Sequence, residues 1–160
     1  MYVEYIKGIT ERYSRLGYAP YNWYRAETPP PWQGLRKPLS ESRLGVLSTA
    51  GTYVAGQVAY YYKDDTSIRR IAKETPVDRV RFSHITEHYL GDARRDPDCI
   101  FPLTQLRRLE AEGEIGELAG EVISCMGGIY SQRRVAEELI PAVEKVFAEQ
   151  AVDAALLVPL

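Results

Sequence analysis

The sequence has few of the residues that mark several large classes of protein. Its 160 residues include only two cysteines, which cannot form the disulfide network of a small secreted domain. No apolar run approaches the roughly 20 residues that a membrane helix needs, and the N-terminal residues lack the apolar core of a signal peptide. Positive charge is not in excess, because the formal net charge is −2. We therefore expect a cytoplasmic protein that binds neither membranes nor nucleic acids.

Phenylalanine is also scarce, whereas tyrosine is abundant, with 12 Tyr against 3 Phe. Tyrosine pairs an apolar ring with a polar tip, which suits a wet cleft or a subunit interface. A chain of this length fits a single domain. We expect one domain over residues 1–160, with a helix and an extended arm in residues 1–40 and the core in residues 41–160.

The N-terminal region combines a helical pattern with a proline-rich stretch. Apolar residues recur at steps of three and four in residues 1–20, which predicts an amphipathic helix. Five prolines in residues 20–40 exclude a helix or a central strand there, and Trp23 and Trp32 lie among them. This Pro/Trp-rich arm either lies across the core of its own domain or embraces another subunit.

The core region alternates between strand-like and helix-like patterns, which predicts the α/β class. We expect three layers, with a mostly parallel sheet between flanking helices. The last apolar run reads as a buried parallel strand, and Pro141 is expected to kink the last helix. Strands are expected at residues 43–48, 68–71, 80–84 and 152–160, helices at 102–112 and 131–149, and a polar loop at 92–98.

The residues that follow the first core strand are small and polar. In open parallel sheets, ligands bind beyond the carboxyl ends of the strands. Ser48, Thr49 and Gly51 would let a ligand approach the backbone closely, although a plain turn explains the same residues. These three are candidate substrate-binding residues.

The two histidines lie four residues apart, at His84 and His88. This spacing could place both on one helix face as metal ligands, but His84 ends a predicted strand and no third ligand is evident, so no metal site is predicted. A histidine in a cleft can bind a carboxylate or transfer a proton near neutral pH; structural hydrogen bonding is the alternative. Tyr89 and Asp92 share the loop.

The two thiols lack the features of a reactive pair. Cys99 and Cys125 are 26 residues apart, so they do not form a CxxC motif. Apolar neighbours predict that Cys99 is buried and structural. Cys125 precedes a pair of glycines and is also interpreted as structural. Neither has a basic neighbour in the sequence that would lower its pKa.

An ordered series of short motifs runs from about Trp32 to the end of the chain. The segments are Lys37-Pro38-Leu39, Ser42-Arg43, Leu47-Ser48-Thr49-Ala50-Gly51, Gly56-Gln57, Thr75-Pro76, Ser83-His84, His88-Tyr89, Phe101-Pro102-Leu103, Glu112-Gly113-Glu114-Ile115-Gly116, Leu118-Ala119, Ser124, Met126-Gly127, Ile129 and Val152-Asp153-Ala154-Ala155-Leu156-Leu157. Together they resemble the N-terminal part of the selenoprotein B family. That family contains the glycine, sarcosine and betaine reductases and D-proline reductase.

The resemblance implies an oxidoreductase that cleaves a C–N bond of glycine, sarcosine, betaine or D-proline, with thiols as the electron source. In this family a selenocysteine or cysteine follows the strand that here ends at Leu160. The true nucleophile is therefore expected beyond residue 160, and the chain is expected to be a fragment truncated at an in-frame UGA codon. No cofactor is expected within this chain.

The resemblance also implies partners and site residues. The partners are other subunits of an oligomeric reductase, namely a pyruvoyl-containing substrate-binding subunit and a small redox protein, together with a small amino-acid substrate. Because its motifs include Ser83-His84 and His88-Tyr89, this loop is the best candidate for a contribution to catalysis. His84 and His88 are predicted as catalytic residues, and Ser48, Thr49, Gly51, Tyr89 and Asp92 as substrate-binding residues.

Two other functions remain compatible with the sequence. The chain could be a non-catalytic assembly module that docks a separate catalytic chain, which would also suit the Pro/Trp-rich arm. It could instead be a flavodoxin-like ligand binder in which residues 48–51 form a phosphate loop.

Overall fold

The computed structural model describes residues 4–20, 24–85 and 90–160, and the chain divides into two compact units, 1–34 and 35–160. In the first unit, helix α1 spans Tyr5–Arg15, which confirms the helix predicted there. The helix is followed by Gly17, whose φ of +83° suits a residue without a Cβ. The rest of the described first unit has no regular structure, and none of the side chains described in it is buried.

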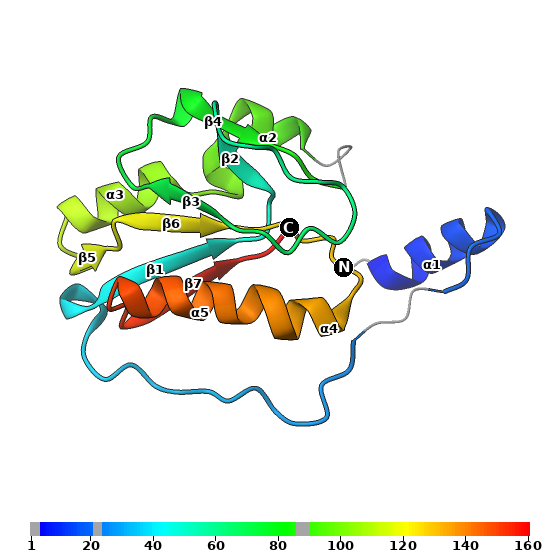
Figure 1. The fold of residues 1–160 in the computed structure, drawn as a ribbon, viewed down its shortest axis with the longest axis horizontal. Helices are drawn as coiled ribbons and strands as arrows, with labels where there is room; N and C mark the ends of the chain where they lie inside the picture. The colour runs from blue at the N-terminus through cyan, green and yellow to red at the C-terminus, as the bar shows by residue number, and fades with distance from the viewer. Residues whose placement is uncertain (1–3, 21–23, 86–89) are drawn as a thin grey trace. The chain divides into compact units, whose positions relative to one another are not determined.

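The second unit is built on a five-stranded sheet (Figure 1). The central strand β1 (Arg43–Ser48) runs parallel to β7 (Ala154–Val158) on one side and to β5 (Glu117–Leu118) and β6 (Glu121–Ser124) on the other. Strand β3 (Arg69–Ala72) pairs with β6 in the antiparallel direction. This arrangement confirms the predicted α/β class with a mostly parallel sheet.

A small second sheet joins β2 (Thr52–Val54) to β4 (Val80–Phe82) in antiparallel register. Strand β4 confirms the strand predicted before His84. Strand β2 was not predicted, because its three residues are too few to show an alternating pattern. Short 3₁₀ turns at Leu39–Glu41, Val77–Arg79 and Pro97–Cys99 connect elements of the described chain.

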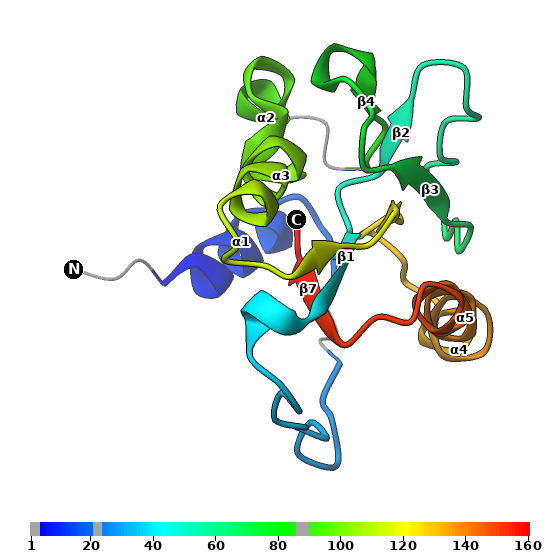
Figure 2. The same cartoon turned by 90° about the vertical axis from the view of Figure 1, so that its left-hand side faces the viewer.

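Helices lie on both faces of the large sheet (Figure 2). On one face, α2 (Gly91–Arg95) and α3 (Leu103–Ala111) help to build the larger core. On the other, α4 (Gln132–Arg134), a π-helical turn (Val135–Leu139) and α5 (Ile140–Glu149) cover a second apolar cluster. No helix in the described part of the chain is long and apolar enough to cross a membrane.

The helix predicted at residues 131–149 is present, but its irregularity lies just before the proline. Pro141 has no N–H to donate to the carbonyl of Glu137, and the backbone adopts a π turn at Val135–Leu139. The loop predicted at residues 92–98 was wrong in part, since Gly91–Arg95 is helical. Ala93, only 2% exposed, anchors this short helix to the core.

Strand β7 is parallel, as predicted, but its predicted burial was wrong. Leu156 is 36% exposed and Leu157 is 63% exposed. Within the described chain, β7 pairs only with β1. The side chains of α5 pack against Ile123 and Leu47, which belong to β6 and β1. An apolar run predicts contact with other apolar groups, but it does not say whether the same chain provides them.

Candidate functional site

The carboxyl ends of three parallel strands meet at one edge of the large sheet. Ser48 of β1 is in register with Ser124 of β6 and Val158 of β7. The segments that follow are joined directly: Thr49 N–H donates to Val158 O at 3.0 Å, and Leu160 N–H donates to Thr49 Oγ1 at 2.9 Å. We call this place the carboxyl edge.

Gly127, three residues after β6, lies where the segments of the carboxyl edge come closest. A Cβ built on Gly127 would lie 2.9 Å from His84 Nε2, 2.9 Å from Thr49 O and 3.1 Å from Leu160 O. Three atoms from distant parts of the sequence therefore surround one point, and only glycine leaves room for them. The structure thus brings His84 to the ends of β1, β6 and β7.

Sequence reasoning did not assign a role to Gly127. Gly127 belongs to the Gly127-Gly128 pair that follows an apolar segment. This pair is the feature of the sequence that could have indicated a close backbone contact there. A close approach of backbone to another group is a common reason for glycine after a strand.

A tight backbone contact holds His84 in place. Gly51 N–H donates to Cys125 O at 2.9 Å, and Ser83 N–H donates to Gly51 O at 3.0 Å. Gly51 has a φ of +63°, and a Cβ there would overlap Ser83 O. The loop after β1 is therefore bonded to the end of β6 and to the residue before His84. The imidazole of His84 is buried, with 6% of its surface exposed.

Of the other predicted site residues, Ser48 ends β1 at the carboxyl edge, whereas Asp92 belongs to a separate helix. Ser48 is fully buried, and its hydroxyl donates to Ile100 O at 2.8 Å and accepts from Ala50 N–H at 3.3 Å. Asp92 lies in the first turn of α2, where its carboxylate is 89% exposed and pairs with Arg95 at 2.8 Å. His88 and Tyr89 lie outside the described residues. The structure thus gathers His84, Ser48, Thr49 and Gly51 at the carboxyl edge, with the Ser48 hydroxyl bonded to Ile100 O.

An apolar groove opens beside the carboxyl edge on the α5 side of the sheet. Its volume is about 400 Å³. Glu144 is the one charged residue in its lining. The apolar groove is lined by Leu47, Thr49, Cys125, Met126, Gly127, Ile129, Val135, Leu139, Ile140, Val143, Glu144 and Phe147.

The two thiols occupy opposite environments. Cys125 is buried, as predicted for a structural residue, and burial raises its pKa to about 11. The predicted burial of Cys99 was wrong, because it ends an exposed 3₁₀ turn. Its pKa is also raised, by partial desolvation and then by the nearby carboxylates of Asp96 and Asp92. Neither thiol is therefore ionised near neutral pH.

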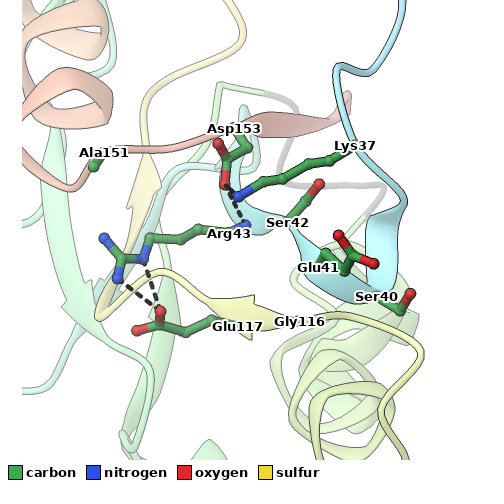
Figure 3. A pocket seen from close by; sticks show the side chains of 9 residues that line it. All are labelled: Lys37, Ser40, Glu41, Ser42, Arg43, Gly116, Glu117, Ala151 and Asp153. Carbon is green, nitrogen blue, oxygen red and sulfur yellow. Dashed lines mark hydrogen bonds and ion pairs between the residues drawn. The ribbon is translucent and has the colours of Figure 1, made fainter.

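A polar pocket of about 490 Å³ lies at the opposite, amino end of the strands (Figure 3). Asp153 accepts from the Arg43 backbone N–H at 2.8 Å and pairs with Lys37 at 2.7 Å. The Arg43 side chain pairs with Glu117 at 2.7 Å and donates to Gln150 O at 2.8 Å. The bond from Arg43, followed by the one from Lys37, lowers the pKa of Asp153.

Two ion pairs in the polar pocket join separate segments of the chain. Lys37, Arg43, Glu117 and Asp153 come from four separate segments, and their pairs fasten β1, β5, the start of β7 and the segment before β1 together. We interpret this pocket as a structural joint, because four of the five charged side chains that line it, all except Glu41, are paired with one another. Among the residues that the structure describes, no cluster of three His, Cys, Asp or Glu side chains could hold a metal ion.

Two comparisons with known proteins, one with a family model and one with a curated relative, indicate the same family. The family model for glycine/sarcosine/betaine reductase selenoprotein B matches residues 75–159, which is just over half of the chain. The D-proline reductase subunit gamma of Acetoanaerobium sticklandii is 33% identical over 131 residues, covering 81% of this chain and 54% of the relative. The chain thus spans about half the length of this curated relative. No solved structure matches this chain.

Proposed function

Because the chain belongs to the glycine/sarcosine/betaine reductase selenoprotein B family, we propose that it forms part of a reductase subunit that cleaves a C–N bond of an amino acid. The match to a D-proline reductase subunit over most of the chain favours D-proline as the substrate. A subunit of this kind works with other subunits, which we propose as its partners.

The observation that carries this proposal is the convergence at Gly127. His84 Nε2, Thr49 O and Leu160 O lie within 3.1 Å of one point at the carboxyl ends of three parallel strands. Ligands of open parallel sheets bind at this kind of edge. A reacting group carried just past β7 would therefore lie beside the imidazole of His84, a kind of side chain that can donate or accept a proton in catalysis.

The proposed reaction balances without a metal or a nucleotide. The C–N bond breaks, the carbon and the nitrogen each gain a hydrogen, and two thiols of an external dithiol are oxidised to a disulfide. For D-proline this opens the ring to a linear amino acid. The chain's own thiols are poor candidates for the nucleophile, because burial or neighbouring carboxylates raise both pKa values.

Two groups from outside the described residues would supply the remaining chemistry. A selenocysteine or cysteine beyond residue 160 would supply the nucleophile, and a pyruvoyl group on a partner subunit would activate the substrate amine. The residues present fit such an arrangement, because Leu160 is held at the carboxyl edge by its bond to Thr49 Oγ1. His84 would then hold or transfer the proton that the leaving nitrogen gains.

The test is the substitution His84→Gln in the assembled reductase, with D-proline as substrate and dithiothreitol as reductant. We expect the reduction rate to fall by about 10²-fold or more, as is typical when a proton-transfer group is lost. The mass of the assembly should be unchanged. Full activity of the variant would contradict the proposed role of His84.

A matched control tests whether the exposed thiol of this chain takes part in catalysis. Cys99→Ser changes an exposed thiol, and we expect it to retain the rate of the parent enzyme. If His84→Gln also retains that rate while the chain remains necessary for assembly, the chain is a non-catalytic assembly module.

A further inference from the structure

The stripe of helical residues that faces the apolar groove contains one charged side chain. Ile140, Val143 and Phe147 line the groove at helical spacings of three and four, and Glu144 lies among them. Glu144 is exposed, and within the described part of the chain its carboxylate forms no ion pair. No lysine, arginine or histidine is among the described lining residues. Glu144 can therefore pair with a cation that comes from outside the chain.

The apolar groove and the carboxyl edge share residues. Thr49 and Gly127 line the groove, and they are also two of the residues that meet at the carboxyl edge. A molecule in the groove therefore borders the point that His84 Nε2 and Leu160 O surround. The groove volume of about 400 Å³ lies within the roughly 300–1,000 Å³ that is typical of small-molecule sites.

The lining of the groove distinguishes between the substrates of the family. Aliphatic side chains such as Leu47, Leu139 and Val143 offer contacts to methylene groups. Glycine has no side-chain carbon and sarcosine has a single N-methyl group, so both would leave most of the groove unfilled. Betaine carries a quaternary ammonium, which proteins bind with several aromatic rings, whereas Phe147 is the one aromatic residue among the described lining residues.

A cyclic amino acid has the properties that this groove requires. Its ring is a chain of methylene groups, and its protonated secondary amine is a cation. We infer that the apolar groove binds the ring of such a substrate while its ammonium group faces Glu144. The inference rests on the proposed function, from which it takes the reaction, and it adds the residues that select the substrate.

The groove and the carboxyl edge thus have separate tasks. Glu144 attracts the cation and the aliphatic lining accepts the ring, which makes them binding groups with no part in proton transfer. A ring held in the groove keeps its C–N bond next to the carboxyl edge, where His84 lies. Binding by the groove and catalysis at the edge can therefore be measured independently.

The first experiment titrates D-proline into the 160-residue chain and follows the methyl groups of isoleucine, leucine and valine by NMR. A ligand this small is expected to bind with a dissociation constant that is roughly millimolar. The methyl signals of Ile129, Ile140 and Val143 in the groove should shift together and saturate. Those of Ile71 and Ile115, which are buried in the larger core, should not move. Groove signals that do not shift would overturn the inference.

Two other ligands separate the ring from the charge. Cyclopentanecarboxylate keeps a five-membered ring and a carboxylate but lacks the amine, and betaine keeps a cation but lacks the ring. We expect each to bind at least about tenfold more weakly than D-proline, because each lacks one of the two contacts. Equal affinity for all three ligands would contradict selection by the groove.

Substitution of Glu144 tests its contact with the ammonium group. Glu144→Gln should raise the dissociation constant of D-proline by about three- to tenfold, and it should not weaken the binding of cyclopentanecarboxylate. Glu149→Gln is the matched control, because Glu149 also belongs to α5 but pairs with Arg70 and is not part of the groove lining. Its D-proline affinity should equal that of the parent chain. Equal weakening of both ligands by Glu144→Gln would contradict the predicted contact.

Substitution of Ile140 tests the contact with the ring. Ile140→Ala retains the charge of the groove and removes part of its aliphatic lining. It should weaken D-proline and cyclopentanecarboxylate alike, by about two- to fivefold, and leave the affinity for betaine unchanged. If Ile140→Ala has no effect on either ring-bearing ligand, the ring does not bind at this part of the groove, and the inference is wrong.

Turnover by the assembled reductase separates this inference from the proposed function. Glu144→Gln should raise KM for D-proline more than it lowers kcat, as expected for a binding residue. If D-proline does not bind to the chain but His84→Gln abolishes turnover, the inference about the groove is overturned and the role of His84 stands. If D-proline shifts the groove signals but His84→Gln retains full activity, the groove inference stands and the proposed role of His84 is contradicted.

Discussion

Individual glycines decide how closely the segments of the carboxyl edge approach. At Gly51 a Cβ would overlap Ser83 O, and the φ of +63° adds strain for any other residue. At Gly127 the backbone conformation is ordinary, and the restriction comes only from three neighbouring atoms. The two positions therefore demand glycine for different physical reasons.

Replacing Gly127 by alanine should displace either His84 or the end of β7. The added Cβ would lie 2.9 Å from His84 Nε2 and from Thr49 O, which is closer than van der Waals contact. We expect the free energy of unfolding, measured in urea, to fall by about 1–3 kcal/mol.

Gly120→Ala provides the matched control for this change. A Cβ at Gly120 meets its nearest neighbour, Gln150 Oε1, at 3.8 Å. Its unfolding free energy should stay close to that of the parent protein. If both variants lost the same amount of unfolding free energy, the close contacts at Gly127 would not be the cause of the loss.

The sequence could place His84 at the candidate site but could not show what surrounds it. The alternating pattern of residues 80–84 shows that His84 follows a strand. The approach of Leu160 and Thr49 to Gly127 depends on the pairing of β7 with β1, between residues about 110 positions apart. No local pattern encodes such a pairing.

At the scale of elements, a polar cluster binds the continuous helical segment formed by α4, the π turn and α5 to the loop before β3. Glu138 accepts from the Thr66 hydroxyl at 2.6 Å and pairs with Arg134 at 2.9 Å. Asp64 Oδ1 accepts from the backbone N–H of Ser131 at 3.0 Å, beside the first turn of the helix. The loop therefore holds the segment that contains the π turn.

The pH dependence of stability should reveal this cluster. Bonds from Arg134 and then from Thr66 lower the pKa of Glu138 from 4.5 to about 2. Because its pKa is lowered on folding, Glu138 stabilises the protein above pH 4.5, and this contribution is lost as the pH falls toward 2.

We expect Glu138→Gln to reduce the loss of unfolding free energy between pH 4.5 and 2, measured by urea unfolding at several pH values. Glu137→Gln is the matched control, since it removes the adjacent exposed carboxylate and its 2.6 Å pair with Arg133 but leaves the Glu138 cluster intact. Parallel pH profiles for the parent protein and Glu138→Gln would contradict the assignment.

Element patterns were informative where they were long. The helix at residues 103–111 and the strand at 43–48 were predicted because their apolar residues repeat at the helical spacing or form one continuous run. Gly91–Arg95 escaped prediction because five residues, four of them not apolar, show no periodicity. Its helical form depends on Ala93 packing against the core.

At the scale of the whole molecule, the polar pocket and the carboxyl edge hold opposite ends of the same strands. Lys37 and the start of β1 are joined to the residue before β7 through Asp153. Glu117 extends this joint to β5 through Arg43. The motif residues of the family resemblance thus include a structural joint as well as the candidate site.

Asp153→Asn should weaken this joint at low ionic strength. The substitution removes the charge that pairs with Lys37 and weakens the acceptor for the Arg43 backbone N–H. We expect a lower urea midpoint than that of the parent protein, with the difference shrinking in high salt as the charges are screened.

Asp78→Asn is the control for Asp153→Asn, because it makes the same chemical change on an exposed 3₁₀ turn far from this joint in the sequence. Its urea midpoint should match that of the parent protein at both salt concentrations. A difference for Asp153→Asn that is unchanged by salt would indicate lost packing instead of lost charge pairing.

The meeting of His84, Thr49 and Leu160 around Gly127 has a consequence for how this protein can change during evolution. A replacement at any of these positions alters the space left for the others, so its effect depends on which residues the others already are. Such positions accept substitutions in a restricted order, and a change that is harmful alone becomes tolerable after a compensating one.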